Sequence, residues 1–248
     1  MNRLLASCIF FTRLPFWRLR QVPAESFRHV LICWPLTGWL TGGLMGATLW
    51  LTAQVLPLPV AALLAIAARI GLSGALHEDG LADFLDGFGG GRTREQTLAI
   101  MKDSGVGTYG VVGLILYFLL LWALLSSFPL PVACWVALSA DAWSKAVAAQ
   151  LANLLPYARK QAESKSQTVY ERMSWQATSF AFLCGLLPLL LLLPPALWWA
   201  GLLPPLVLLF LWRGMKKRLQ AYTGDCCGAT FLLCELSFYL AAACLIES

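Results

Sequence analysis

The sequence predicts an all-α, polytopic integral membrane protein with about seven transmembrane helices and its active site on the cytoplasmic face. Of its 248 residues, 59% are hydrophobic and only 12% are charged, with a mean hydropathy of +0.70. Soluble domains carry about 25% charged residues. The apolar residues form long continuous runs, whereas a membrane β-barrel needs alternating segments. We therefore expect residues 1–248 to form a single membrane-embedded catalytic domain.

The N-terminal segment, residues 1–28, is basic and only partly apolar. It opens with "MNRLLASCIFFTRLPFWRLR", in which further arginines follow a short apolar stretch. No small-residue cleavage site follows that stretch, so it does not resemble a removable signal. We expect an amphipathic, cytoplasmic segment on the membrane surface.

Seven apolar segments are long enough to be considered as spans. The sixth is short and flanked by prolines, and "PLLLLLPPALWWAGLLPP" also fits one long broken helix or a re-entrant pair. The expected spans are residues 29–52, 57–76, 108–128, 130–152, 175–194, 196–212 and 227–246.

Basic residues mark every second connection. The N-terminal segment and the connections after the second, fourth and sixth spans carry Lys and Arg, whereas "TAQVLPLP", "SSFPLP" and "PP" carry no charge. The positive-inside rule places the N-terminus and all long loops on the cytoplasmic side. We expect the protein to be a multi-pass protein of the inner cell membrane. The net charge of +5 is then an ordinary basic membrane flank, and no nucleic-acid partner is expected.

An acidic segment occupies residues 77–107, in one of the expected cytoplasmic loops. Asp79, Asp83 and Asp86 follow an i, i+4, i+7 spacing that puts them on one face of a helix. No Lys or Arg occurs between Gly71 and Gly91 to balance them. Clustered carboxylates suit Mg²⁺ or Mn²⁺. The expected metal ligands are Glu78, Asp79, Asp83 and Asp86.

Glycines and basic residues follow the carboxylates. Glycines let the backbone approach a ligand, and consecutive N–H groups can form an anion-binding nest. With a metal and nearby cations, these are the components of a diphosphate site. The expected phosphate-binding set is Gly89, Gly90, Gly91, Arg92, Arg94, Lys102, Ser104 and Thr223.

A second cluster, "YTGDCCGATFLLCE", covers residues 222–235. Asp225 lies at the cytoplasmic entrance of the last span, and Glu235 lies deeper. An ionisable group at membrane depth predicts function. Asp141 and Lys145, spaced i, i+4, are expected to pair. The eight cysteines show no metal-type spacing and are interpreted as small packed hydrophobes.

Three of these motifs carry a family resemblance. "HEDGLADFLDGFGGG", "IMKDSGVGTYG" and "TGDCCGATFLLCE" resemble the motif regions of the cobalamin synthase family, adenosylcobinamide-GDP ribazoletransferases. "FFTRLPF", "WPLTGWLTGG" and "YAR" at Tyr157–Arg159 are similar to the same family, in the same order. Gly105 stands where that family usually has Arg, and Cys226–Cys227 replace an apolar pair. The first departure puts one phosphate contact in doubt, unless Lys102 or Arg94 supplies it.

The resemblance implies a metal-dependent transfer. A ribose hydroxyl of α-ribazole, or of its 5′-phosphate, attacks adenosylcobinamide-GDP, and GMP leaves. Asp225 or Asp103 is the candidate base, with His77 as a further candidate, and which carboxylate is base and which is ligand stays open. The partners expected are these two substrates and the lipid bilayer; a homo-oligomer and contacts with other cobamide-assembly enzymes are left open.

Three rival functions share features of this sequence. A CDP-alcohol phosphotransferase uses a similar Asp-rich pattern, but it needs an Arg after the Ala, where Asp83 stands here. An aromatic prenyltransferase would show two Asp-rich motifs. An ion-coupled transporter would hold its carboxylates near the bilayer midplane. The resemblance favours the transferase.

Overall fold

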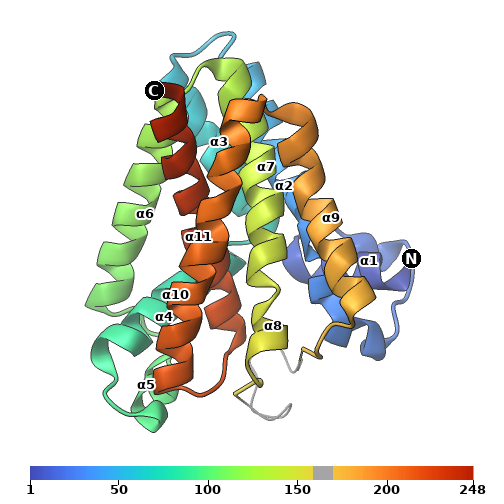
Figure 1. The fold of residues 1–248 in the computed structure, drawn as a ribbon, viewed down its shortest axis with the longest axis vertical. Helices are drawn as coiled ribbons and strands as arrows, with labels where there is room; N and C mark the ends of the chain where they lie inside the picture. Colours follow the sequence, from blue (N-terminus) through green and yellow to red (C-terminus); the bar gives the residue numbers. More distant parts are fainter. Residues whose placement is uncertain (159–169, 248) are drawn as a thin grey trace.

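The structure, a computed structural model, describes residues 1–158 and 170–247 as an elongated bundle of helices (Figure 1). Within these residues no strand is formed, which confirms the all-α prediction. The elements are α1 (Asn2–Phe11), η1 (Phe16–Arg18), η2 (Ala24–Ile32), α2 (Trp34–Thr52), α3 (Leu58–Ser73), α4 (Leu76–Gly90), α5 (Arg94–Ile100), α6 (Thr108–Ser127), α7 (Leu130–Ala148), α8 (Leu151–Leu154), α9 (Trp175–Leu192), η4 (Pro195–Leu202), α10 (Leu203–Arg218) and α11 (Gly224–Glu247).

Four helical segments are long and apolar enough to cross a membrane, or up to six if each of two bent pairs forms one span. The four are α6, α9, η4 with α10, and α11, and the bent pairs are η2 with α2 and α3 with α4. A multi-pass membrane fold is therefore confirmed. Helix α7 covers the remaining expected span but is not among these candidates, and it carries Asp141 and, in its last turn, Lys145. The count of seven spans stays a prediction.

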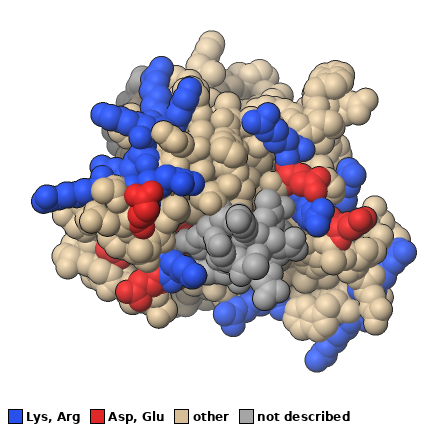
Figure 2. Space-filling view, turned by 90° about the horizontal axis from the view of Figure 1, so that it is seen from below, with Lys and Arg blue, Asp and Glu red and all other residues tan. Residues whose placement is uncertain are grey.

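The two ends of the bundle differ in their connections. Helices α5 and α8 lie at the lower end in Figure 1, and the C-terminus lies at the upper end. Lys and Arg gather on the lower face, around fewer Asp and Glu residues (Figure 2). The basic connections thus share one end, as the alternating charge pattern predicts, although Arg159, Lys160 and Lys165 lie outside the described residues. Which side of the membrane this end faces stays a prediction.

The N-terminal helix packs on the bundle. Ala6, Cys8 and Phe11 of α1 are buried, and the helix contacts η2 and α2. Ser7 donates a hydrogen bond to the carbonyl oxygen of Val30 at 3.0 Å. Part of the segment at residues 1–28 therefore packs against the protein itself, because the apolar face of α1 contacts η2 and α2.

Helix α7 forms the centre of the bundle, with α2, α9 and α11 packed around it. Glycines on α2 allow a close approach to α7. A Cβ at Gly38 would lie 2.7 Å from the Cα of Ala142, and one at Gly42 would lie 2.7 Å from the carbonyl oxygen of Ala137. Small residues of this kind let membrane helices pack backbone to backbone. Large side chains at either position would push α2 away from α7.

The acidic segment begins as a buried helix and not as a loop, which corrects the expectation for residues 77–90. The chain bends by 90° between α3 and α4. Gly74 and Ala75 make the bend with φ angles of 69° and 58°. Glycine adopts this left-handed region freely, whereas alanine there is strained by roughly 1–2 kcal/mol. The bend turns α4 against α6 and α11, and that packing explains why its polar residues are buried.

Candidate active site

Two glycines bring the acidic helix α4 against the start of α11. A Cβ at Gly80 would lie 3.1 Å from both the Cα and the carbonyl oxygen of Asp225. A Cβ at Gly228 would lie 3.2 Å from the carbonyl oxygen of His77. Both distances are tighter than ordinary contact, so the crossing needs glycine on both helices. Two motifs that are far apart in the sequence therefore meet at this crossing.

An open cavity lies beside the crossing, and Asp79 and Asp225 both line it. Its volume is about 100 Å³, whereas one water needs roughly 10–15 Å³. Asp79 is exposed and Asp225 is half-buried. Asp83 is buried one turn further along α4 and is not among the lining residues. The lining residues are Phe10, Phe11, Leu31, Trp34, Leu76, His77, Asp79, Tyr157, Tyr170, Gly224, Asp225, Cys227 and Gly228.

Thr223 fixes the start of α11. Its hydroxyl oxygen accepts a hydrogen bond from the N–H of Cys226 at 3.3 Å, as an N-cap does, and the hydroxyl lies 3.2 Å from Oδ2 of Asp225. Thr223 is fully buried. It was expected to bind phosphate, but the structure uses it to cap the helix and to orient Asp225. The cap position is therefore filled by Thr223, and Asp225 is left for another role.

Two loops supply tyrosines to the cavity. The N–H of Ala158 donates to the carbonyl oxygen of Tyr222 at 2.8 Å, and the N–H of Tyr222 donates to that of Pro156 at 3.0 Å. This pairing holds Tyr157 against Tyr170, with ring centroids 5.7 Å apart. Burial raises the pKa of Tyr170 well above its usual value, and it also raises the pKa of Tyr222. Both hydroxyls therefore stay protonated at neutral pH.

His77 lies within an aromatic cluster. Its ring centroid is 4.9 Å from that of Phe231, 5.5 Å from that of Trp34 and 5.8 Å from that of Phe11. The side chain is buried, and Nε2 has no hydrogen-bond partner among the residues that the structure describes. His77 thus contributes a wall to the cavity, and its role as a base stays a prediction.

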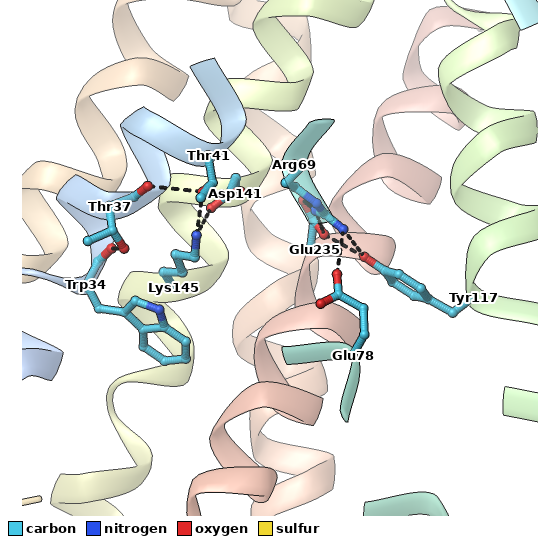
Figure 3. Close-up of polar contacts among 9 residues, drawn as sticks. All are labelled: Trp34, Thr37, Thr41, Arg69, Glu78, Tyr117, Asp141, Lys145 and Glu235. Atoms are coloured by element: carbon cyan, nitrogen blue, oxygen red, sulfur yellow. Dashed lines mark hydrogen bonds and ion pairs between the residues drawn. The ribbon is translucent and has the colours of Figure 1, made fainter. Parts of the chain in front are cut away.

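Glu78 faces the interior of the bundle (Figure 3). Its Oε1 lies 3.6 Å from Nη2 of Arg69, and both side chains are buried. Arg69 Nη1 donates to both carboxylate oxygens of Glu235 at 2.6 Å, and Nη2 donates to the hydroxyl of Tyr117 at 2.8 Å. Tyr117 in turn donates to Glu235 at 2.9 Å. This group of four, the Arg69 network, joins α3, α4, α6 and α11.

A second polar group, the Lys145 network, lies beside the first in Figure 3. Lys145 Nζ lies 2.5 Å from Oδ1 of Asp141, which confirms the expected pair. Lys145 also donates to the hydroxyl of Thr41 at 2.6 Å, and that hydroxyl donates to Oδ2 of Asp141 at 2.7 Å. All three side chains are buried, so the ion pair lies within α7 and Thr41 of α2 completes its hydrogen bonds.

Asp86 caps the neighbouring helix α6. Its carboxylate accepts hydrogen bonds from the N–H of Gly107 at 2.7 Å and from the N–H of Gly110 at 2.9 Å. A Cβ at either glycine would lie 2.6 Å from a carboxylate oxygen of Asp86. The glycines of "GVGTYG" therefore make room for this carboxylate, which satisfies N–H groups that lack partners in the first turn.

The expected four-carboxylate metal cluster is not assembled in this fold. No group of three or more His, Cys, Asp or Glu side chains is placed to hold a metal ion within the described residues. Glu78 faces Arg69, and Asp86 faces the start of α6. The i, i+4, i+7 spacing holds on α4, but buried partners on neighbouring helices separate its members. Metal binding stays a prediction; Asp79 and Asp225 line the cavity, and Asp83 lies one turn along α4 from Asp79.

Most of the expected phosphate-binding residues lie away from the cavity. Gly90 and Arg92 line a shallow surface depression with Gln96. Arg94 Nε donates to the carbonyl oxygen of Leu219 at 2.9 Å, which ties α5 to the end of α10. The other members are Gly89, which is exposed, Gly91, which is buried, and Lys102 and Ser104, which are exposed.

Asp103, a candidate base, is exposed in the turn before α6. Its Oδ1 accepts a hydrogen bond from the N–H of Gly105 at 3.3 Å. It is not among the residues that line the cavity. This placement favours Asp225 over Asp103 as the carboxylate beside a bound substrate.

The sequence reasoning missed Arg69 and the aromatic lining. Arg69 is a lone cation inside an apolar span, and an ionisable residue there is a signal of its own. Phe11 and Trp34 gave no such signal, because aromatic residues at helix ends are common in membrane proteins.

Comparison with known proteins agrees with the motifs. The family model described as cobalamin-5-phosphate synthase matches residues 3–243. The chain is 37% identical over 232 residues to a protein of Ralstonia pickettii named adenosylcobinamide-GDP ribazoletransferase, which covers 92% of this chain and 89% of that protein. A protein of Leptothrix cholodnii with the same name is 38% identical over 255 residues, with 94% and 93% covered.

A third relative, from Shewanella putrefaciens and with the same name, is 37% identical over 239 residues, with 93% of this chain and 89% of the relative covered. No solved structure gives a significant match. The family match extends over nearly the whole chain and over all three motifs, so the chain belongs to the cobalamin-5-phosphate synthase family.

Proposed function

We propose that this protein is an adenosylcobinamide-GDP ribazoletransferase of the inner membrane, with its active site on the cytoplasmic side. It would join adenosylcobinamide-GDP to α-ribazole, or to its 5′-phosphate, and release GMP. The observation that carries the proposal is the cavity where Asp79 and Asp225, from two separate motifs, line the same space. The name shared by the relatives supports the reaction. Family membership does not favour the phosphotransferase or transporter alternatives.

The proposed reaction needs a base and charge stabilisation. A ribose hydroxyl of the acceptor forms a bond to the phosphorus that carries the corrinoid arm, and the bond from that phosphorus to GMP breaks. Asp225 is the proposed base, because Thr223 orients its carboxylate at the edge of the cavity. It would accept the proton of the attacking hydroxyl.

A divalent metal fits the donors at this place. The cavity has two carboxylates and, among the described residues, no Lys or Arg in its lining. Oxygen donors of this kind suit Mg²⁺ or Mn²⁺. We propose that Asp79, with Asp83 or Asp225, holds the ion, which would neutralise the diphosphate and the leaving phosphate. Glu78 and Asp86 would instead support the site, because they already have buried partners.

The experiment is a transfer assay with the full-length protein purified in detergent. We expect turnover with Mg²⁺ or Mn²⁺, none in EDTA, and recovery when metal is restored. Turnover should fall by orders of magnitude in each of the variants Asp79→Asn, Asp83→Asn and Asp225→Asn. Each change should remove several kcal/mol of transition-state stabilisation. Glu95→Gln, in the same acidic segment but exposed on α5, is the matched control and should keep wild-type turnover.

Two results would contradict the proposal. Wild-type turnover in a fully chelated sample would exclude the metal. A near-normal rate in Asp225→Asn would exclude Asp225 as the base, and the variant's stability would show whether Asp225 has only a structural role. Because Thr223 provides the cap, we expect little change in the unfolding temperature of Asp225→Asn.

A further inference from the structure

The cavity beside Asp79 and Asp225 has a chemical character that separates the two proposed substrates. We propose, on the basis of the proposed function, that this cavity binds the nucleoside acceptor. The benzimidazole base would lie among the aromatic rings of the lining, and the ribose hydroxyls would lie at the two carboxylates. Adenosylcobinamide-GDP would then approach from outside the cavity. The lining of the cavity and two ring nitrogens without partners support this assignment.

The lining is mainly aromatic. One wall holds Phe11 stacked on Trp34, with centroids 4.9 Å apart and planes at 16°, next to His77. The other holds Tyr157 and Tyr170 in an edge-to-face pair. Aromatic rings favour flat aromatic ligands through stacked or edge-to-face contact. A benzimidazole nucleoside offers such a surface and carries no charge on its base at neutral pH.

The described charges of the lining favour the nucleoside in the interior of the cavity. It contains the carboxylates Asp79 and Asp225, and no Lys or Arg lines it among the described residues. A diphosphate is recognised by cations, by clustered N–H groups or by a metal. A nucleoside instead presents hydroxyl donors, and carboxylate oxygens accept hydrogen bonds from them. The interior of the cavity therefore suits the acceptor nucleoside, and the metal ion proposed at the exposed Asp79 would hold the diphosphate at the edge.

Two lining residues carry ring nitrogens without partners. Nε1 of Trp34 and Nε2 of His77 are buried, and neither has a hydrogen bond within the part of the chain that the structure describes. Buried polar atoms normally find a partner, and both residues belong to the lining, so a ligand bound in the cavity would supply one. The unsubstituted ring nitrogen of a benzimidazole nucleoside is an acceptor, which matches the N–H of Trp34.

Gly224 provides the sharpest test of occupancy. It lines the cavity, and a Cβ built on it would meet only the hydroxyls of Tyr157 and Tyr170, both at 3.9 Å. That is ordinary contact, so Gly224→Ala should fold, and Gly224→Leu should fill the cavity. The matched control is Gly214→Leu, at an exposed position on α10 where a Cβ would meet nothing within 4 Å.

The experiment measures binding and kinetics separately. Equilibrium dialysis of the detergent-purified full-length protein would use α-ribazole as one probe and GDP as the other. We expect wild type and Gly214→Leu to bind α-ribazole saturably. Gly224→Leu should weaken that affinity at least about tenfold, with a graded loss in Gly224→Ala. In steady-state kinetics, the KM for α-ribazole should rise while the KM for adenosylcobinamide-GDP stays within about twofold.

The outcomes separate the two proposals. If wild type binds α-ribazole and Gly224→Leu does not, the nucleoside assignment stands even where no transfer is detected, and the proposed function alone fails. If transfer occurs but Gly224→Leu and Gly224→Ala leave α-ribazole binding and its KM unchanged, the assignment is overturned. Loss of GDP affinity or a raised KM for adenosylcobinamide-GDP alone would place the other substrate in the cavity. No α-ribazole binding by wild type, with and without GDP, would also overturn it.

Discussion

Replacement of Arg69 by methionine should lower the free energy of unfolding by about 3–5 kcal/mol, the usual cost of breaking a buried ion pair. Arg69 is 2% exposed and Glu235 is fully buried. The guanidinium holds both oxygens of Glu235 at 2.6 Å and lies 3.6 Å from Glu78. Its removal therefore leaves two buried carboxylates without their cation, which puts the expected cost at the upper end of that range.

The structure also predicts an order within the Arg69 network. Glu235→Gln should cost less than Arg69→Met, because Glu78 and Tyr117 remain beside the guanidinium. Tyr117→Phe removes a hydroxyl that bridges Arg69 and Glu235 and should cost about 1 kcal/mol. The double variant Arg69→Met with Glu235→Gln should be less destabilised than the sum of the two single changes, because the second removes the charge that the first leaves unpaired.

The assay is denaturant unfolding in detergent, followed by far-UV circular dichroism. Arg213→Met, which removes an exposed arginine from α10, is the control and should change the stability little. An Arg69→Met variant less than about 1 kcal/mol below wild type, or strictly additive effects in the double variant, would refute the view that these charges depend on one another.

Three further predictions concern the cap of α6, the crossing of α4 with α11 and the membrane topology. Asp86→Asn should cost about 1–2 kcal/mol and speed amide exchange at the start of α6, because an amide has one acceptor oxygen for two N–H groups; unchanged exchange would contradict the cap. Gly80→Ala should lower turnover more than stability, because its Cβ would sit 3.1 Å from the backbone of Asp225; normal turnover would show that the crossing tolerates separation. The topology can be tested in a Cys244→Ser background, in which the other seven cysteines are buried. A cysteine replacing Arg92 should react with an impermeant maleimide only from the cytoplasmic side, and one replacing Val55 only from outside. The reverse labelling pattern would show that the predicted topology is inverted.

The fold was largely predictable because long apolar runs and alternating basic connections are properties of the sequence itself. The failure lies at α4, where residues 77–90 were expected to be a cytoplasmic loop. A hydropathy scale assigns each carboxylate to an exposed position, because it does not include partners that lie far away in the sequence. Glu78 and Asp86 instead find an arginine on α3 and two backbone N–H groups on α6, and these partners depend on the 90° bend at Gly74 and Ala75.

The site was predictable only in part, for the same reason. Asp79 and Asp225 each lie at the end of a span that the charge pattern predicts to be cytoplasmic, and both line the cavity. The position of Asp83 depends on the packing of α4 and could not be read from its spacing. Thr223 was assigned to phosphate because hydroxyls bind phosphate, but its place before α11 makes it a cap.

The Arg69 network has a consequence for how the protein is made. Arg69 and Glu235 are 166 residues apart, so at about 5–20 residues per second the arginine waits roughly 8–30 s for its main partner. During that time α3 must be held in the membrane with a residue whose insertion costs about 2.5–3.5 kcal/mol, and Glu78 is its nearest acidic neighbour in the chain. Lys145 meets Asp141 within a single helix and needs no such delay. The carboxylate that neutralises α3 therefore arrives only with α11, so a chain truncated before Glu235 would leave Arg69 without its main partner.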